Sequence, residues 1–276
     1  MCACRGTAGF AHVSCLAEQA KILVAEAEEN NLDDKPFNER WVRWLNCSLC
    51  EQRYHGVVWC ALGWACWKTY LGRPEWDWAR RGAMSVLGNA LFDVERYEDA
   101  LSVQEAELSM ARRLDASEEH ILVVRSNLAS TYEVLGRDEE ALVLRRDVHS
   151  RRVNRDGEEH TTTLIAANNY ALSLMHLQRY QEAKSLLRRT LPVARRVLGD
   201  DDETTLRLRW YFAGGVVEDP ASTLDDLREA VATLVEIERT ARRVLGGAHP
   251  TTTGIEHRLR LARAALRARE TLSGKS

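Results

Sequence analysis

The chain has no cysteine after residue 66, no long apolar run and almost no excess charge. It carries 38 Lys and Arg against 41 Asp and Glu, and this net charge of −3 favours neither nucleic acid nor an anionic membrane surface. The longest apolar stretch, Gly56–Trp67, holds only about a dozen residues before Lys68 and is too short to cross a bilayer. Met1–Phe10 contains no apolar run of the kind that a secretory signal needs. We therefore expect a cytoplasmic protein that neither spans a membrane nor binds nucleic acid.

A recognisable catalytic motif is also missing. The sequence has no phosphate-binding glycine loop, no nucleophile elbow and no spaced carboxylate pair that differs from ordinary helix surface. We therefore expect that no side chain of this chain acts as a catalytic residue.

The dominant positive feature is a repeat. Asn127–Leu142 and Asn169–Lys184 align with a shift of 42 residues. Small residues recur midway along the first helix of each copy and at the start of its second helix: Gly88, Ala129, Ala171 and Ala213, then Ala100, Ala141, Ala183 and Ala230. Antiparallel helices approach to about 8–10 Å only where the crossing residues are small. Because one such pair cannot bury its own apolar face, successive pairs must stack. The pattern predicts an all-α solenoid of antiparallel helix pairs.

Several short motifs within the repeat resemble a known family. The words NLASTYEVLGRDEEAL, ARRVLG (at Ala194–Gly199 and Ala241–Gly246) and AHPTTT (at Ala248–Thr253) resemble the tetratricopeptide repeats (TPR) of kinesin light chain. Over residues 83–272, the resemblance implies about four helix pairs and a capping helix. The helix predicted over Leu206–Val217 contains Gly214-Gly215 and is expected to be the weakest, because an interior glycine costs up to about 1 kcal/mol against alanine.

Helix-pair solenoids present a concave surface that is lined by the first helix of each pair. The helical period places six candidate peptide-binding residues on that side: Asn89, Asn127, Asn168, Asn169, Arg207 and Trp210. A carboxamide can donate to and accept from a peptide backbone at once. In related arrays the Asn of N-L-A does so, and Asn127 and Asn169 match it. The sequence thus predicts a protein or peptide partner in the groove, with hydrogen bonding between neighbouring helices as the alternative role of these asparagines.

The cysteines lie close to histidine near the N-terminus, in the order Cys2-x-Cys4, His12-x2-Cys15 and Cys47-x2-Cys50. In a reducing compartment such a cluster indicates metal binding before disulfides. Together with the words CRGTAGFAHVSCL and CSLC, this order resembles the latter part of a RING-CH (RINGv) zinc finger. The resemblance implies that Cys2, Cys4, Cys47 and Cys50 bind one structural Zn²⁺, and that His12 and Cys15 belong to a second site. A set of buried thiols is the alternative.

Three parts are therefore expected: a partial RING-CH-like zinc module over residues 1–55, a tryptophan-rich helical junction over 56–82 and the TPR array over 83–272. Within the zinc module, helices are predicted over Ser14–Glu29, capped by Ser14, and over Asn38–Leu45. In the junction, one helical face carries Val57, Cys60, Trp64 and Leu71. We interpret this face as packing between the zinc module and the repeats rather than as an aromatic ligand cage.

These features predict an intracellular adaptor that binds peptide segments in the TPR groove and is stabilised by zinc at its N-terminus. The alternative is a RING-CH-type ubiquitin ligase, which would dock a ubiquitin-conjugating enzyme and use the TPR array to select substrate. Two departures weaken the alternative. The second zinc site lacks half of its ligands, and Gln19 stands where the family has tryptophan.

Overall fold

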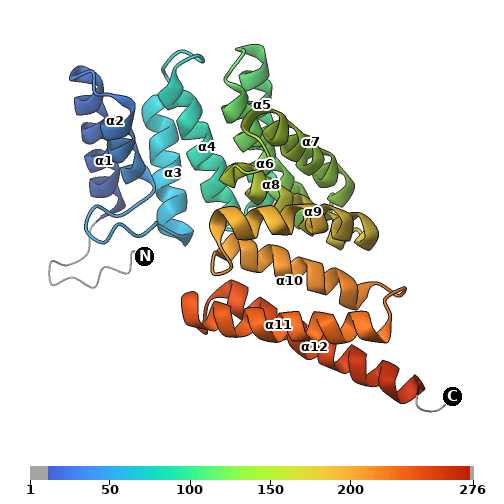
Figure 1. Ribbon diagram of the computed structural model, residues 1–276. Helices are drawn as coiled ribbons and strands as arrows, with labels where there is room; N and C mark the ends of the chain where they lie inside the picture. Colours follow the sequence, from blue (N-terminus) through green and yellow to red (C-terminus); the bar gives the residue numbers. More distant parts are fainter. Residues whose placement is uncertain (1–11, 274–276) are drawn as a thin grey trace. The chain divides into compact units, whose positions relative to one another are not determined.

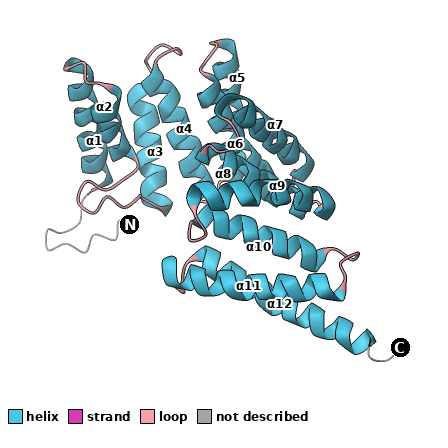
Figure 2. Cartoon of the chain, viewed as in Figure 1, coloured by secondary structure: helices cyan, strands magenta, loops and turns pink. Residues whose placement is uncertain are grey.

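The computed structural model describes residues 12–273, which form twelve α-helices, one short 3₁₀-helix and no β-strand (Figures 1 and 2). The chain divides into two compact units, Met1–Gly136 and Arg137–Ser276. Among the described residues, no helix is both long enough and apolar enough to cross a membrane. The predicted all-α, TPR-like helical repeat is confirmed.

The first unit contains six α-helices, namely α1 (Val13–Glu29), α2 (Asp34–Trp41), α3 (Gly56–Tyr70), α4 (Trp78–Asp93), α5 (Tyr97–Arg113) and α6 (Glu118–Val134), with the 3₁₀-helix Val42–Trp44 after α2. Each helix from α4 to α6 packs on the one before it, and α3 packs on α1. This order follows from short connections, because each brings the next helix back against its predecessor.

The first two helices differ from the prediction at their starts. The N-cap of α1 is His12, whose side chain makes no capping hydrogen bond, so Ser14 lies inside the helix rather than capping it. Helix α2 begins at Asp34 rather than Asn38. Pro36 does not prevent this because it lies in the first turn, where no intrahelical partner for its missing N–H is required.

The junction helix α3 buries a different face from the one predicted. Val57 is 79% exposed and Trp64 is 37% exposed, whereas Trp59, Leu62 and Tyr70 are buried. Helix α3 is apolar almost all round, with Lys68 as its single charged residue. Periodicity therefore does not select the face that packs. The interpretation of the Trp64 face as buried packing is wrong, although tryptophan does build this region: Trp41 lies against Tyr70 and Trp78, and Trp44 is fully buried.

The second unit consists of α7 (Asp138–Asp156), α8 (Thr161–His176), α9 (Tyr180–Leu198), α10 (Glu203–Glu218), α11 (Leu224–Val244) and α12 (Pro250–Ser273). Consecutive helices pack on one another, and α10 also packs on α8 and α12. The small residues predicted at the crossings are buried: Ala171, Ala183, Ala213 and Ala230 are at most 4% exposed. Helix α10 runs unbroken through Gly214-Gly215.

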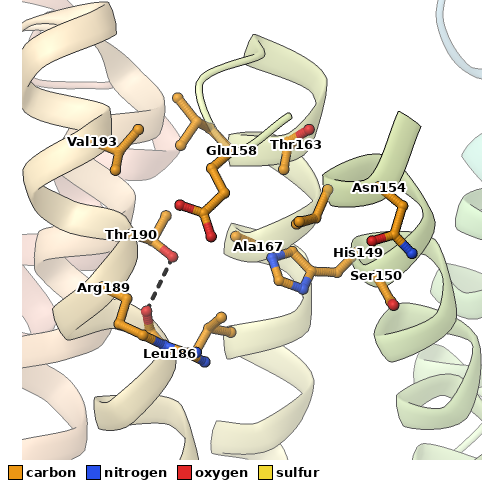
Figure 3. Close-up of a pocket in the computed structure, with 12 residues that line it drawn as sticks. His149, Ser150, Asn154, Glu158, Thr163, Ala167, Leu186, Arg189, Thr190 and Val193 are labelled. Carbon is orange, nitrogen blue, oxygen red and sulfur yellow. Dashed lines mark hydrogen bonds between the residues drawn. The ribbon is translucent and has the colours of Figure 1, made fainter. Parts of the chain in front are cut away.

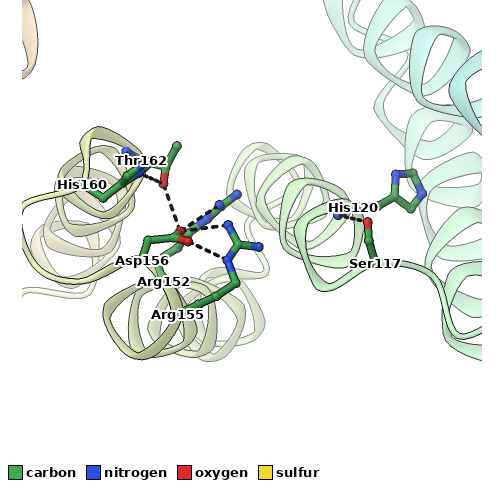
Figure 4. A network of polar contacts seen from close by, with 7 residues as sticks. All are labelled: Ser117, His120, Arg152, Arg155, Asp156, His160 and Thr162. Atoms are coloured by element: carbon green, nitrogen blue, oxygen red, sulfur yellow. Dashed lines mark hydrogen bonds and ion pairs between the residues drawn. The ribbon is translucent and has the colours of Figure 1, made fainter. Parts of the chain in front are cut away.

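Glycine and capping side chains fix where these helices end and begin. Gly157 follows α7 and Gly199 follows α9, with φ of +86° and +88°, a conformation that glycine adopts without strain. His160 then caps α8, since its Nδ1 accepts the N–H of Thr162 at 3.3 Å. Asp156 accepts hydrogen bonds from Arg155, Arg152 and Thr162, which tie the end of α7 to the start of α8 (Figure 4). The Arg155 hydrogen bond is the main cause that lowers the pKa of Asp156 to about 2.

An arginine recurs on α5, α9 and α11, the second helices of three helix pairs. In each pair it forms an exposed ion pair with an acidic residue that lies just before the first helix of the same pair. Arg113 pairs with Glu75 at 2.6 Å in the first unit, and Arg196 with Glu159 at 2.6 Å in the second. Arg243 pairs with Asp201 at 2.8 Å in the same way. Exposed pairs of this kind contribute about 0–1 kcal/mol each, so they indicate a solvated face rather than a phosphate-binding strip.

Candidate functional site

The structure covers only part of the predicted zinc ligand set. Cys2 and Cys4 lie outside the described residues. Among residues 12–273, no three His, Cys, Asp or Glu side chains gather in a way that could hold a metal ion. His12 and Cys15 are exposed at the start of α1, and Cys47 is buried.

The Cys47–Cys50 segment forms a tight turn. The N–H of Leu49 donates to Cys47 Sγ at 3.4 Å, and the N–H of Cys47 donates to the Gln52 carbonyl at 2.9 Å. Asn46 and Arg53 form an antiparallel bridge across its base. The packing cluster around Cys47 includes Cys50 and also Val13 and Leu16. The turn therefore lies against the start of α1.

The predicted asparagines divide into two groups. Asn89 on α4 and Asn127 on α6 are half-buried in the first unit, and Asn169 on α8 is half-buried in the second. Asn168 is only 2% exposed, and its Nδ2 donates to Asn169 Oδ1 at 3.2 Å. This corrects the placement of Asn168 on the groove side. Consecutive residues of a helix point about 100° apart, and here Asn168 is buried whereas Asn169 is half-buried.

A cavity of about 310 Å³ opens between α8, α10 and α12 of the second unit. We call it the α8–α12 groove. It is lined by Leu172, Met175, His176, Trp210, Tyr211, Gly214, Glu218 and Arg258. These three helices are the first-helix positions of the predicted array, so the groove lies on the side where the sequence predicts partner binding. Trp210 is the one predicted residue among those that line it.

Close packing on glycine shapes the groove. The indole of Trp210 lies directly on α12 at Gly254, where a Cβ would come within 2.4 Å of the ring. At Gly214 on α10, a Cβ would lie 3.5 Å from Arg258 Nε and 3.6 Å from Met175 Cε. Gly254 thus allows the Trp210 ring to lie against the backbone of α12, whereas a Cβ at Gly214 would make ordinary contacts with Arg258 and Met175. Trp210 therefore packs between helices as well as lining the groove.

Of the two arginines in and beside the groove, one forms an ion pair and the other does not. Arg258 forms an ion pair with Glu218, which neutralises both groups. Arg207 lies one turn before Tyr211 on α10, donates to its hydroxyl at 3.3 Å and has no carboxylate partner among the described residues. One half-buried guanidinium therefore remains uncompensated, and a carboxylate placed beside it would be stabilised.

A buried ion pair fixes the end of α10 beneath this groove. Lys184 on α9 pairs with Asp219, which also accepts from Gln181 Nε2 at 2.6 Å and from the N–H of Ala221 at 3.0 Å. Lys184 is the main cause that lowers the pKa of Asp219. Because Asp219 follows Glu218 directly, this pair positions a residue that lines the groove.

Sequence reasoning missed Arg258, Glu218 and Met175. Gly214 and Gly254 are the signal that could have revealed them, since a glycine inside a long helix indicates close approach by another group. The interior glycine was interpreted only as a weak point of α10.

Comparison with known proteins supports the repeat and nothing more specific. The sequence profile described as tetratricopeptide repeat matches residues 162–213, which span α8, α9 and the first part of α10. No curated protein matches the chain. These results give no support to the RING-CH resemblance of residues 1–55.

Solved structures show a similar fold at low sequence identity. A Podospora anserina protein, described as a putative kinesin light chain with nearly identical TPR-like repeats, is 16% identical with a TM-score of 0.56, over 85% of this chain and 98% of the other. A variant form of that protein is 18% identical with a TM-score of 0.55 over the same shares. A Rap protein complexed with competence and sporulation factor is 13% identical with a TM-score of 0.52, over 91% of this chain and 66% of the other. The chain therefore has a TPR-like fold with kinesin-light-chain-like structural neighbours.

Proposed function

We propose that this protein is a cytoplasmic adaptor that binds a peptide segment of a partner protein in the α8–α12 groove. The observation that carries the proposal is the open cavity between three first-position helices, with aromatic and apolar walls. Leu172, Met175 and Trp210 supply surface for one apolar side chain of the partner. Arg207 supplies a cation without a carboxylate partner among the described residues. The groove thus suits a segment that carries an acidic residue close to a bulky apolar one.

Two further observations support this proposal. The TPR profile covers α8 and α9, and a Rap protein with a similar fold is complexed with competence and sporulation factor.

Selection from a random displayed peptide library against the purified full chain tests the groove. We expect the selected sequences to be enriched in an acidic residue close to Leu, Phe or Met. Arg207→Glu should weaken the binding of the selected peptides by roughly ten-fold or more, because a hydrogen bond to a charged group contributes about 1.5–3 kcal/mol. Asn169→Ala on α8, a residue of the same unit that does not line the groove, should weaken their binding by less.

Arg239→Glu is the matched control for Arg207→Glu. Arg239 lies on α11, also has no ion pair among the described residues, and does not line the groove. Equal losses for Arg207→Glu and Arg239→Glu would show that binding follows net charge and not the groove. If Asn169→Ala binds normally but unfolds at a much lower temperature, this asparagine is structural.

Zinc binding by residues 1–55 is the second part of the proposal. The Leu49 N–H donated to Cys47 Sγ supports it, since such a donor favours the thiolate, which is the form that binds metal. Cys2, Cys4, Cys47 and Cys50 would hold the ion, with His12 and Cys15 as candidates for a second. The ubiquitin-ligase alternative, with a ubiquitin-conjugating enzyme as partner, has no support in the described residues or in the matches to known proteins.

Metal analysis of the purified chain is expected to return about one Zn²⁺ per molecule, as a single four-thiolate site would require. Cys47→Ser should remove it. Cys66→Ala is the matched control, because Cys66 is fully buried and burial raises the pKa of its thiol. A metal-free protein whose exposed thiols all react freely would overturn the zinc proposal and leave the groove proposal untouched.

A further inference from the structure

A second cavity, of about 230 Å³, lies between α7, α8 and α9 (Figure 3). We call it the α7–α9 cavity. It shares no lining residue with the α8–α12 groove. Its floor is apolar, formed by Leu164, Ala167 and Leu186 with Val153 and Val193 beside them. For scale, an engineered cavity of about 150 Å³ holds benzene.

Several of the polar groups around this floor have no partner among the described residues. The Glu158 carboxylate and the His149 imidazole point into the same space from opposite sides (Figure 3). Arg189 on α9 also lines the cavity, and neither it nor Glu158 makes an ion pair with the described residues. Thr163 is 2% exposed, and its hydroxyl oxygen has no hydrogen-bond partner among those residues. A buried hydroxyl left unsatisfied is costly, which indicates that something else completes this site.

In the next repeat, a side chain of the protein itself fills the space that corresponds to the α7–α9 cavity. Shifts of 42 residues in the turn and first helix, and of 47 in the second helix, align Glu158 with Asp200, Ala167 with Arg209 and Arg189 with Glu236. Arg209 is 7% exposed, and its guanidinium lies 2.8 Å from Glu236 and 3.8 Å from Asp200.

The unsatisfied hydroxyl also has a satisfied counterpart in that repeat. Thr205 corresponds to Thr163, and its hydroxyl donates to the Ala194 carbonyl at 3.4 Å. The α7–α9 cavity thus exists because Ala167 replaces the arginine that fills the equivalent space.

The charges around the open cavity differ from those around Arg209. Arg209 lies between two acids, whereas the space above Ala167 lies between one acid, Glu158, and one base, Arg189. Burial and the neighbouring Arg189 lower the pKa of His149, so its imidazole is neutral at pH 7. A ligand with only a positive charge would be repelled by Arg189, and a ligand with only a negative charge would be repelled by Glu158. The complementary ligand carries both charges on one small apolar body.

We propose that the α7–α9 cavity binds a free aliphatic α-amino acid. Glu158 receives its ammonium and Arg189 its carboxylate, while its side chain lies on Leu164, Ala167 and Leu186. Asn154 and Ser150 at the rim add hydrogen-bonding groups. The site would make this chain responsive to a small metabolite independently of its protein partner.

Calorimetric titration of the purified full chain with L-leucine tests this assignment. We expect binding of L-leucine, and at least ten-fold weaker binding of N-acetyl-L-leucine, which lacks the ammonium, and of L-leucinamide, which lacks the carboxylate. Absence of binding by leucine, isoleucine and valine at millimolar concentration would overturn the proposal. Equal binding of leucine and either blocked form would do so too, because it would assign the cavity to a simple anion or cation.

Variants locate the site. Glu158→Gln and Arg189→Gln should each weaken the binding of L-leucine at least ten-fold. Glu159→Gln should not, since Glu159 is paired with Arg196 and does not line the cavity. The double variant Ala167→Arg/Arg189→Glu reproduces the charge order of Asp200, Arg209 and Glu236, so it should fold, as circular dichroism would report, and bind no leucine. Leucine affinity that survives Glu158→Gln, or survives in a folded double variant, would place the ligand elsewhere and refute the assignment.

Discussion

The substitution Lys184→Met is expected to lower the free energy of unfolding of the second unit by about 3–5 kcal/mol. The Lys184 ammonium and the Asp219 carboxylate join α9 to the end of α10, and their side chains are 9% and 8% exposed. Removing the cation leaves a buried carboxylate with only Gln181 and the Ala221 N–H as donors among the described residues. Urea unfolding followed by circular dichroism measures the loss.

Two companion variants separate burial from charge. Arg179→Met breaks the exposed Arg179–Glu182 pair on the same helix and should cost no more than about 1 kcal/mol. Lys184→Met/Asp219→Asn should recover most of the loss, because no buried charge remains. If Lys184→Met costs no more than Arg179→Met, the buried pair does not stabilise α10.

The pH dependence of this pair has a definite sign. Lys184, more than any other group, lowers the folded-state pKa of Asp219, so the stabilisation is present at neutral pH. It is lost as the pH falls through that lowered pKa. In Lys184→Met this lowering is removed, and the stability curve should be flatter on its acid side.

Sequence periodicity predicted the repeat well because close helix crossings require small side chains. Ala141, Ala183 and Ala213 were placed at crossings from spacing alone, and they are 0–1% exposed. Periodicity failed at α3, where apolar residues occupy every face and no polar stripe indicates which side meets solvent. The packing of α1, α4 and the segment around Cys47 and Tyr54 decides that Trp59 is buried, while Trp64 is half-exposed.

The candidate sites were harder to predict than the fold. The α8–α12 groove depends on Arg258 and Met175 lying over Gly214, a contact between different helices that no single-helix pattern contains. The α7–α9 cavity had a signal in the sequence, namely Ala167 at the position of Arg209. Recognising it requires knowing that Arg209 points inward between two acids, which is a property of the folded chain.

The substitution Glu107→Gln is expected to stabilise the first unit at about pH 8 by roughly 3 kcal/mol, through the pKa of this carboxyl. Glu107 on α5 is 1% exposed and accepts a hydrogen bond from the Ser85 hydroxyl of α4. Burial raises its pKa to about 7. In the unfolded chain a glutamate has a pKa of about 4.3. Between these values the folded state holds a proton that the unfolded state has released, so stability falls as the pH rises and levels off above about pH 7.

Glutamine keeps the shape of Glu107 and an acceptor for Ser85 but cannot ionise, so the variant should lack this decline. Urea unfolding followed by tryptophan fluorescence from about pH 5 to pH 8 measures the difference, since seven of the 8 tryptophans lie in residues 1–136.

His120, whose Nε2 lies 3.4 Å from the Glu107 carboxylate, and the nearby Arg81 also face this site. Burial, and then the charge of Arg81, lower the pKa of His120. The contribution of His120 to stability therefore rises with pH, opposite to that of Glu107. Glu105→Gln, exposed on the same helix, is the control and should change stability by less than about 0.5 kcal/mol at every pH. A Glu107→Gln curve parallel to the wild-type curve between pH 5 and pH 8 would show that Glu107 is ionised in the folded protein.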